Sequence, residues 1–345
     1  MDKYFQEAKD KSLKTQTSYN IELLARLIVS DASFLTLREK LLFLEFLLKD
    51  DEGNHFQTEK SFENRFLSLT LTSISLSVKR VFPRARWSAE GSLKKVLVSK
   101  RIMEIQGIKS TCYTDSDFPA MLREMKDPPF MLFYRGNLEI LKRKCLSVVG
   151  TRRAFPQTLR AASDFSKEAC DDGFCVVSGL AFGIDAASHK GALLSQNPAT
   201  CAILPSGIDT ITPHSHTRLA AKILERGGLI MSEYVPGTPA VAFRFVQRNR
   251  IIAALSSDTV VIQAPVGSGA MITAGFALDY NRNVLFHKEA FSDDARKLNQ
   301  AEVEKIKREI SAGKKIEAKL ENSPENFVRD GAFVIESFAQ FKELG

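Results

Sequence analysis

Glycines, hydroxyl side chains and arginines recur directly after apolar runs in the middle of the chain. They form four groups: Gly150-Thr151-Arg152-Arg153, Ser178-Gly179 with Phe182-Gly183, Ser206-Gly207, and Gly267-Ser268-Gly269. Free backbone N–H groups at glycine turns, hydroxyls and a guanidinium are the groups with which proteins hold phosphate. The residue types therefore predict a phosphate-binding site. In this site Arg152 either grips the phosphate or pairs internally with a carboxylate such as Asp185.

Apolar runs of strand length position these groups, and a helix-length segment separates each run from the next. The runs cover residues 146–150, 176–179, 202–207, 230–233 and 260–264, with a sixth at 284–287. This alternation predicts a doubly wound, mostly parallel α/β sheet. Ligands of such sheets bind outside the carboxyl ends of the strands. The four groups are therefore expected to meet at one edge of the sheet.

Three arginines open the helix that is expected at residues 243–255: Arg244, Arg248 and Arg250. Cations at a helix N-terminus oppose the helix dipole, so an anionic partner is expected for them. The partner is either a carboxylate of the chain itself, Glu233 or Asp185, or an external phosphate.

Cofactors, metals and covalent catalysis are disfavoured. The dinucleotide fingerprint is absent, because Ile272 stands where a third glycine would follow Gly267 and Gly269, and no Walker A sequence occurs. His214 and His216 lie near an aspartate but lack further residues at metal-ligand spacing. No nucleophile signature is present either. We therefore expect no cofactor, no metal and no catalytic residues.

The bulk composition agrees with a globular protein of about two domains. The chain has 345 residues, 44% of them hydrophobic and 26% charged, and its net charge of +7 permits a phosphate-bearing partner. Its five cysteines contain no C-x-x-C pair, which indicates buried thiols in a reducing compartment. The first residues lack a signal-peptide core and no run is long enough to span a bilayer. A cytoplasmic protein without a membrane partner is expected.

The flanking segments predict a three-part organisation. Residues 18–50 show two amphipathic helices, and residues 67–72 alternate with period two, as in a strand. Residues 87–107 form a cationic helix, either a solvated face or an auxiliary nucleic-acid surface. Past residue 290 a charged helix is expected, and residues 327–341 are apolar enough to dock on the sheet. The predicted parts are a helical domain (1–110), a sheet domain (111–290) and a C-terminal extension (291–345).

Several motifs together resemble the DNA-processing protein A family, also called DprA or Smf. They are Val149-Gly150-Thr151-Arg152, the run from Val177 to His189, Phe245 with Arg248-Asn249-Arg250-Ile251-Ile252, and Gly267-Ser268-Gly269 with Ile272-Thr273-Ala274. The resemblance extends from Tyr113 to Phe286. It implies an extended Rossmann-like domain that binds single-stranded DNA. It also implies a homodimer that loads the RecA recombinase in natural transformation, without catalysis.

The resemblance also implies a set of DNA contacts. They are Gly150, Thr151 and Arg152 at the centre, Ser178, Gly179, Phe182 and Gly183 beside them, and Arg248, Asn249, Arg250, Gly267, Ser268 and Gly269 around the rim. Phe182 is proposed to stack on a base. This chain departs from the family after the third strand, where a DNA-binding cation is either missing or replaced by His214 or His216. No winged-helix domain is expected.

Two rival functions use the same fold. Phosphoribohydrolases of a related group carry a catalytic carboxylate in a late glycine motif, but this chain has Thr273 at that position. A sensor that binds a small nucleotide without turnover would use the same pocket. Competition between nucleotide and DNA would separate the sensor from the DNA-binding protein.

Overall fold

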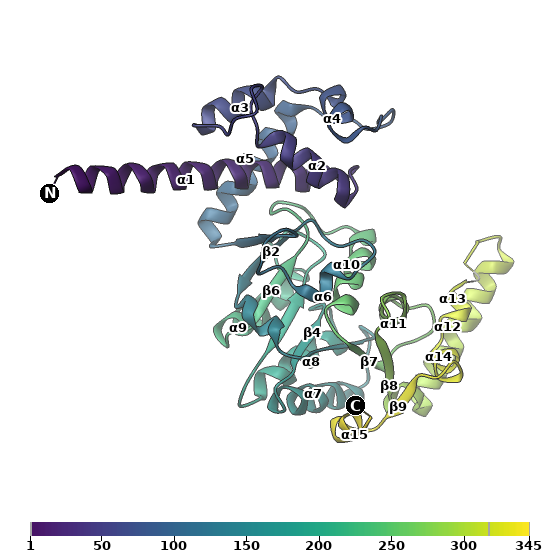
Figure 1. The fold of residues 1–345 in the computed structure, drawn as a ribbon. Coiled ribbons are helices and arrows are strands. Elements are labelled where there is room, and N and C mark those ends of the chain that lie inside the picture. Colours follow the sequence, from purple (N-terminus) through teal and green to yellow (C-terminus); the bar gives the residue numbers. More distant parts are fainter. Residues whose placement is uncertain (1, 317, 345) are drawn as a thin grey trace.

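A nine-stranded sheet forms the centre of the computed structural model, which describes residues 2–316 and 318–344 (Figure 1). The strand order is β1-β2-β6-β5-β4-β3-β7-β8-β9. The strands are β1 (Lys109–Cys112), β2 (Met131–Gly136), β3 (Cys145–Gly150), β4 (Cys175–Ser178), β5 (Thr200–Ile203), β6 (Leu229–Ser232), β7 (Asp258–Gln263), β8 (Asn283–His287) and β9 (Phe333–Ile335). Neighbours from β6 to β9 are parallel, whereas β2 runs antiparallel to β1 and β6. The predicted mostly parallel sheet is confirmed.

Helices cover both faces of the sheet, because successive strand residues point to opposite sides. These helices are α6 (Ala120–Arg123), α7 (Pro156–Asp171), α8 (Ile184–Leu194), α9 (Thr217–Glu225), α10 (Ala242–Ala254) and α11 (Gly269–Asp279), with short 3-10 turns at Leu138–Lys142 and His214–His216. Leu146 and Val148 of β3 pack with residues of α7 and α8, and Val149 packs with residues of α10 and α11. After β3 the chain builds outward to β6 and then returns to place β7 on the other side of β3. Such a reversal leaves a crevice at the carboxyl ends of the strands.

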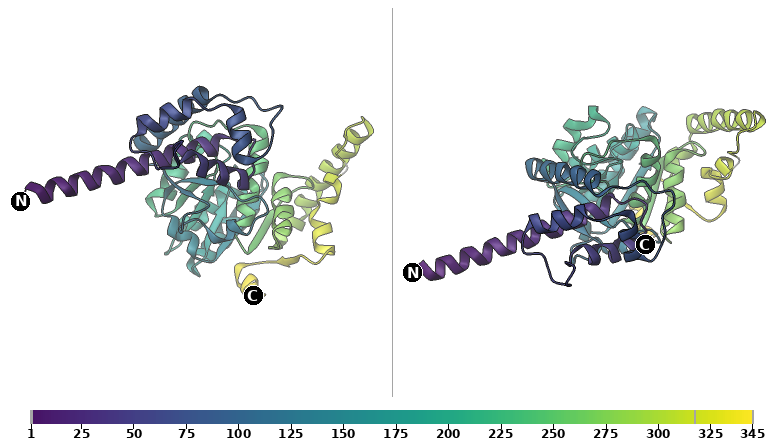
Figure 2. Two further views of the ribbon diagram at one scale, coloured as in Figure 1. Left: turned by 45° about the horizontal axis from the view of Figure 1, so that its top comes forward. Right: turned by 90° about the horizontal axis from the view of Figure 1, so that it is seen from above.

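Five helices precede the sheet and lie above its β2–β6 side (Figures 1 and 2). They are α1 (Asp2–Asp31), α2 (Leu37–Leu47), α3 (Glu59–Leu67), α4 (Leu71–Val78) and α5 (Ala89–Gln106). Phe43, Phe62 and Phe66 are fully buried between them and form their core. The helices predicted within residues 18–50 and 87–107 are confirmed.

The strand predicted at residues 67–72 is wrong. Leu67 ends α3, and Thr70 caps α4 by accepting a hydrogen bond from the backbone N–H of Ser73. Ile74 and Val78, four residues apart, are the buried residues of α4. The alternating pattern arose because a helix end and a Ser/Thr cap follow each other closely, and Ser and Thr favour caps over strand interiors when a neighbouring N–H is free.

Buried and half-buried polar contacts fix the helical part to the sheet part. Arg26 of α1 forms an ion pair of 2.6 Å with Asp115, just after β1. Ser99 of α5 donates a hydrogen bond of 2.8 Å to the carbonyl of Pro236, in the loop that follows β6. The α5 cations expected to be solvated are partly paired, since Lys100 lies 3.1 Å from Glu59. The helical part therefore lies beside loops at the carboxyl edge of the sheet.

The C-terminal residues add an arm and an edge strand. They form a 3-10 turn (Lys288–Phe291), α12 (Asp293–Ser311), α13 (Ala318–Glu321), α14 (Pro324–Arg329), β9 and α15 (Phe338–Glu343). Helix α12 carries the expected charged residues and projects from the body (Figure 2). Phe338 and Phe341 of α15 are buried against Phe165 and Phe174, which lie on the α7 side of the sheet.

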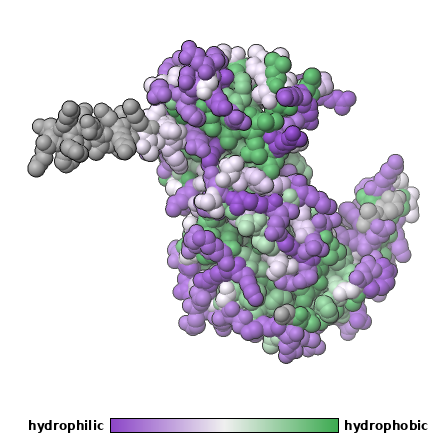
Figure 3. Space-filling view, viewed as in Figure 1, coloured by the Kyte–Doolittle hydropathy of each residue, from purple (hydrophilic) through white to green (hydrophobic). Residues whose placement is uncertain are grey.

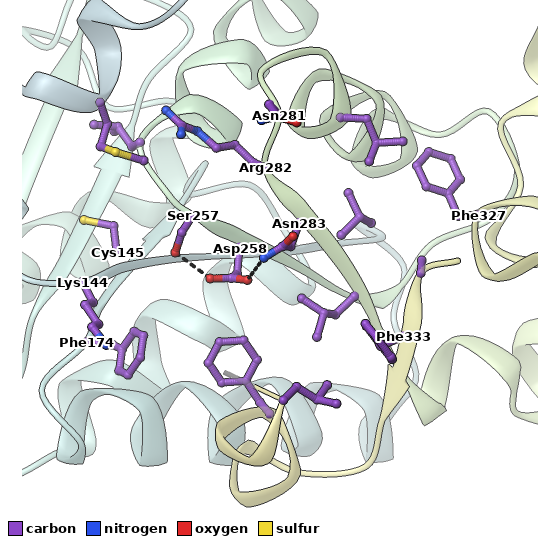
Figure 4. Close-up of a pocket in the computed structure, with 18 of the residues that line it drawn as sticks. Lys144, Cys145, Phe174, Ser257, Asp258, Asn281, Arg282, Asn283, Phe327 and Phe333 are labelled. Atoms are coloured by element: carbon purple, nitrogen blue, oxygen red, sulfur yellow. Dashed lines mark hydrogen bonds between the residues drawn. The ribbon is translucent and has the colours of Figure 1, made fainter. Parts of the chain in front are cut away.

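A cavity with a volume of about 1100 Å³ lies at the amino ends of the strands. Figure 4 shows its aromatic walls, which include Phe174, Phe327 and Phe333. Hydrophobic residues also show at the surface around β8 in Figure 3. Asp258 lines this cavity, and its carboxylate accepts hydrogen bonds from the side chains of Ser257 (2.5 Å) and Asn283 (2.8 Å). This carboxylate is thus satisfied within the chain and faces the edge opposite to the crevice.

Helix α8 carries a histidine with no exposed surface, His189. Its Nδ1 lies 2.7 Å from Thr200 Oγ1, and because that hydroxyl donates to the Val176 carbonyl, the imidazole is the donor of the pair. Burial, together with the positive charge of Arg248, lowers the pKa of His189 to about 3. The folded protein therefore holds this imidazole neutral well below neutral pH.

We predict that His189 makes folding stability acid-sensitive. Its pKa of about 3 in the folded state lies below the ordinary value of about 6.5, so the unfolded chain takes up the proton first. The contribution of neutral His189 is complete above about pH 6.5 and is lost progressively toward pH 3. Between pH 7 and pH 5 the unfolding free energy of the native chain should fall faster than that of His189→Gln, by up to about 1.4 kcal/mol per pH unit. Urea unfolding at three pH values measures this, and parallel curves would contradict it.

Candidate nucleic-acid interface

A cavity of about 720 Å³ opens at the carboxyl ends of β3 and β7, between α10 and α11. It is the crevice expected from the strand order. Its lining includes Gly150, Thr151, Arg152, Arg153, Ala181, Asp185, Val241, Ala242, Phe245, Val246, Arg248, Asn249, Ser268, Gly269 and Thr273. The structure thus brings together three of the segments that the sequence singled out.

Like its neighbour Arg153, Arg152 is an exposed cation at this cavity. It follows the last residue of β3, and its guanidinium lies over the ring of Phe245, 5.2 Å from the ring centroid. In the described part of the chain no carboxylate lies within ion-pair distance of Arg152, so the internal pair with Asp185 is not formed. A guanidinium held on an aromatic face keeps its N–H edge free for a ligand.

Arg248 lies beneath the cavity and not at its rim as expected. It is 3% exposed, and its Nη1 donates hydrogen bonds to the carbonyls of Ile203 and of Gly179, the latter at 2.7 Å. Burial lowers the pKa of Arg248 to about 10, so the group remains charged at neutral pH. Its Nε has no hydrogen-bond partner among the described residues. Arg248 therefore holds the ends of β4 and β5 together and adds positive charge to the cavity floor.

Asp185 is the carboxylate that balances this buried cation. Its Oδ2 accepts hydrogen bonds from the backbone N–H groups of Gly179 (3.1 Å) and Ala181 (3.4 Å). Burial raises the pKa of Asp185, while the charge of Arg248 opposes that rise. The N–H groups after β4 that were expected to bind phosphate are thus already occupied.

Arg250 faces away from the cavity, contrary to the expected contact with phosphate. Its guanidinium forms an ion pair with Glu233 and donates a hydrogen bond of 2.9 Å to the carbonyl of Asp127. Glu233 is itself buried, and burial raises its pKa. The sequence left open whether the arginines of this helix pair with a carboxylate of the chain or with an external phosphate. Arg250 pairs with a carboxylate of the chain, that of Glu233. Its charge is therefore neutralised inside the protein.

The glycines allow close packing more than they expose N–H groups. A side chain at Gly179 would begin 2.5 Å from Arg248 Nη1, and one at Gly150 would begin 2.5 Å from Ile184 Cγ1. The N–H of Thr151 donates to the Gln263 carbonyl, and that of Gly267 donates to Asn322. Around Gly269, at the start of α11, the cavity lining has backbone N–H groups for which no acceptor is present in the described residues.

Three further residues that were predicted to contact DNA differ in where they lie relative to the cavity. Ser178 is buried and donates to the Val148 carbonyl at 2.7 Å, so it faces the sheet. Asn249 lines the cavity and donates to the Gly269 carbonyl at 3.1 Å. Phe182 lies outside the cavity, is 49% exposed, and contacts the ring of His216 edge-on at 4.8 Å. Phe182 and His216 therefore form a separate surface next to the cavity mouth.

Sequence reasoning missed the role of Phe245, whose ring lies under the guanidinium of Arg152. The signal was present, because Phe245 and Asn249 lie four positions apart and so share one helix face.

No cluster of three or more metal-ligating side chains occurs within residues 2–316 and 318–344. Within the same residues, no helix has both the length and the apolar character that a membrane crossing requires.

Gly183 lies in the turn between β4 and α8, and its substitution tests how much this turn contributes to stability. Its φ is +75°, and an added Cβ would lie 2.2 Å from the Thr151 carbonyl oxygen. Gly183→Ala should therefore destabilise the protein by about 1–3 kcal/mol or more. The control is Gly275→Ala within α11, where an added Cβ meets nothing within 4 Å, and it should stabilise by up to about 1 kcal/mol. Thermal unfolding measures both, and equal melting temperatures for the two variants would refute the packing role of Gly183.

Comparisons with known proteins identify the family of this chain. A family model described as DNA recombination-mediator protein A matches residues 109–338. Protein Smf of Borreliella burgdorferi is 31% identical over 284 residues, which cover 81% of this chain and 84% of that protein. DNA processing protein DprA of Streptococcus pneumoniae is 36% identical over 181 residues, 52% of this chain and 63% of that protein.

A solved structure shows the same fold. The crystal structure of DprA from Streptococcus pneumoniae superimposes with a TM-score of 0.64 and 27% sequence identity. The superposition covers 93% of this chain and 97% of that one. The chain therefore belongs to the DNA recombination-mediator protein A family, as its motifs predicted.

Proposed function

We propose that this protein binds single-stranded DNA, with the backbone phosphates in the cavity at the carboxyl ends of β3 and β7. The observation that carries the proposal is Arg152, an exposed guanidinium placed on the ring of Phe245 without a carboxylate partner in the described chain. Arginine grips phosphate oxygens with two parallel hydrogen bonds. Gly269, at the start of α11, adds a backbone N–H to the same cavity.

The charge of the cavity supports an anionic ligand. Three arginines line it, Arg152, Arg153 and Arg248, against one carboxylate, Asp185, which gives a net charge of +2. A concave site with excess positive charge concentrates phosphate-bearing ligands and makes their affinity depend on salt. The cavity is therefore suited to a polyanion more than to a neutral metabolite.

The aromatic residues around the cavity support a single strand over a duplex. Phe245 lies within the cavity, and Phe182 is half exposed beside it. Aromatic side chains stack on base faces, which are accessible in single strands and covered in a duplex. We therefore retain Phe182 as a base contact of the proposed strand and add Phe245.

The family membership extends the proposal to recombination. We infer that the protein acts in the cytoplasm, protects single strands and loads the RecA recombinase onto them during recombination or natural transformation. We also infer a homodimer, because β9 leaves one edge of the sheet open and exposes Phe333 and Val334 there. In this scheme residues 111–290 bind DNA, while residues 1–110 and 291–345 are accessory parts.

Turnover is not part of this proposal. Thr273 lines the cavity where a related hydrolase has a carboxylate, and its hydroxyl donates to the Gly269 carbonyl at 3.1 Å. Asp185 is the carboxylate of the lining, and two backbone N–H groups occupy its Oδ2. The carboxylate of Asp185 therefore stabilises the turn after β4. Binding without chemistry is the function that these residues support.

Arg152→Ala should weaken binding of an oligo-dT strand and reduce the slope of log affinity against log salt by about one phosphate contact, roughly 0.7 for a single strand. Arg152→Lys should lie between the native chain and the alanine variant, because a lysine keeps the charge and loses the fork. Fluorescence anisotropy at four salt concentrations measures these slopes.

The control is Lys144→Ala, which removes an exposed cation just before the opposite end of the same strand, β3. It should leave both the affinity and the salt slope unchanged. If Arg152→Ala melts normally and binds as tightly as the native chain, the assigned site is wrong. A duplex that binds more tightly than the single strand would argue against the stacking contacts.

A second experiment separates the DNA-binding protein from its two rivals. Incubation with nucleoside monophosphates should release no free base, because the cavity lacks a suitably placed free carboxylate. Unlabelled mononucleotide should displace oligo-dT only at concentrations far above that of the strand, since one nucleotide offers a single phosphate contact. Base release that Thr273→Val or Arg152→Ala abolishes would support the hydrolase, and displacement at equal concentration would support the sensor.

A further inference from the structure

A cluster of aromatic and cationic side chains lies outside the cavity, at the start of α10 and in the loop that follows β6. Its arginine, Arg244, lies between two rings, with its guanidinium 5.1 Å from the centroid of Tyr234 and 5.4 Å from that of Phe243. Phe243 is 63% exposed, although it belongs to the first turn of a helix next to the cavity. We call these three residues the α10 cluster.

The arginine of the α10 cluster is held in place but not neutralised. Its Nη1 donates to the carbonyl of Pro239, and no carboxylate of the described chain lies within ion-pair distance of it. Tyr234 is fixed in turn, because its hydroxyl donates a hydrogen bond of 3.0 Å to Gln247. A fixed guanidinium beside an open aromatic face can serve both halves of a nucleotide, phosphate and base.

The helix geometry places the α10 cluster next to the cavity, around the first turn of α10. Ala242, Phe245 and Asn249, spaced three and four residues apart, line the cavity. Gln247 lies on the other side of α10 from Phe245 and Asn249, since it is offset from each by two positions. Phe243 lies between that side and the lining, because Val246, three positions on, still lines the cavity. The α10 cluster is therefore adjacent to the cavity mouth around the N-terminal turn.

The surface between the α10 cluster and the cavity is open and apolar. Val241 is 36% exposed and Val246 is 40% exposed, and both also line the cavity. Single exposed apolar residues are common on protein surfaces, but several around one ligand cavity indicate a contact surface. The apolar surface thus runs from the cavity over the start of α10 to Phe243.

We propose that the α10 cluster is a second nucleotide subsite, in which Phe243 stacks on a base of the strand whose phosphate is held at Arg152. The strand leaves the cavity over the first turn of α10, and Arg244 contacts the phosphate that precedes or follows the stacked base. The subsite rests on the proposed function, because it needs a strand already bound in the cavity. It makes the affinity depend on bases as well as on phosphates.

The test compares two ligands of equal length, an oligo-dT and a strand of the same length made of abasic residues. Phe243→Ala should weaken binding of oligo-dT by at least about fivefold, the lower end for loss of one stacked base. It should change the affinity for the abasic strand by less than about twofold, because the phosphate contacts are retained. Phe243→Trp, which keeps a ring, should bind oligo-dT as the native chain does.

Two controls make the outcome specific. Tyr19→Ala removes another exposed aromatic residue, on α1 and 59% exposed, and should not affect either ligand. Arg152→Ala should weaken binding of both ligands, because it removes a phosphate contact. Thermal unfolding of each variant shows whether the fold is intact.

The results distinguish failure of the subsite from failure of the proposed function. If Arg152→Ala weakens binding and Phe243→Ala does not, the subsite is refuted and the DNA-binding function stands. If Phe243→Ala weakens both ligands equally, the ring supports the fold or the backbone contact, and base stacking is refuted. If the native chain binds neither ligand, the proposed function fails and the subsite fails with it.

Discussion

The buried guanidinium of Arg248 is the interaction on which the rest of the candidate site depends. A charge that is 3% exposed needs hydrogen-bond acceptors and a counter-charge, because removing it from water costs several kcal/mol. The carbonyls of Gly179 and Ile203 supply acceptors at the ends of β4 and β5, and Asp185 supplies the charge. The same requirement explains Gly179, since any side chain there would occupy the place of the guanidinium.

This interaction fixes α10 against the carboxyl edge of the sheet, and the helix then positions the ligand groups. Phe245, three residues before Arg248, faces the cavity and supports Arg152. Arg250, two residues after it, points the other way, where Glu233 neutralises it. One helix therefore carries two buried arginines that hold the fold together. Arg152, which is exposed and free to meet phosphate, comes from the end of β3.

The sequence predicted the sheet and its ligand edge because buried parallel strands are apolar runs that end at glycine turns. It could not separate Arg248 and Arg250 from phosphate ligands, since a buried pair and a free cation look alike along a chain. The N–H groups after β4 were assigned to phosphate for the same reason, because the sequence does not show that Asp185 folds back onto them. The strand expected at residues 67–72 failed because Thr70 is a helix cap, and caps and strands share Ser and Thr.

The central claim is that a single strand lies across the carboxyl edge of the sheet, from Arg152 over the start of α10. Backbone hydrogen exchange with and without oligo-dT tests it most directly, because bound DNA shields the amides beneath it. The account predicts slower exchange at residues 150–153, 241–246 and 268–271, with no change at residues 143–145 and 281–283 at the opposite edge. Protection confined to that opposite edge, around Asp258 and Phe333, would contradict the account.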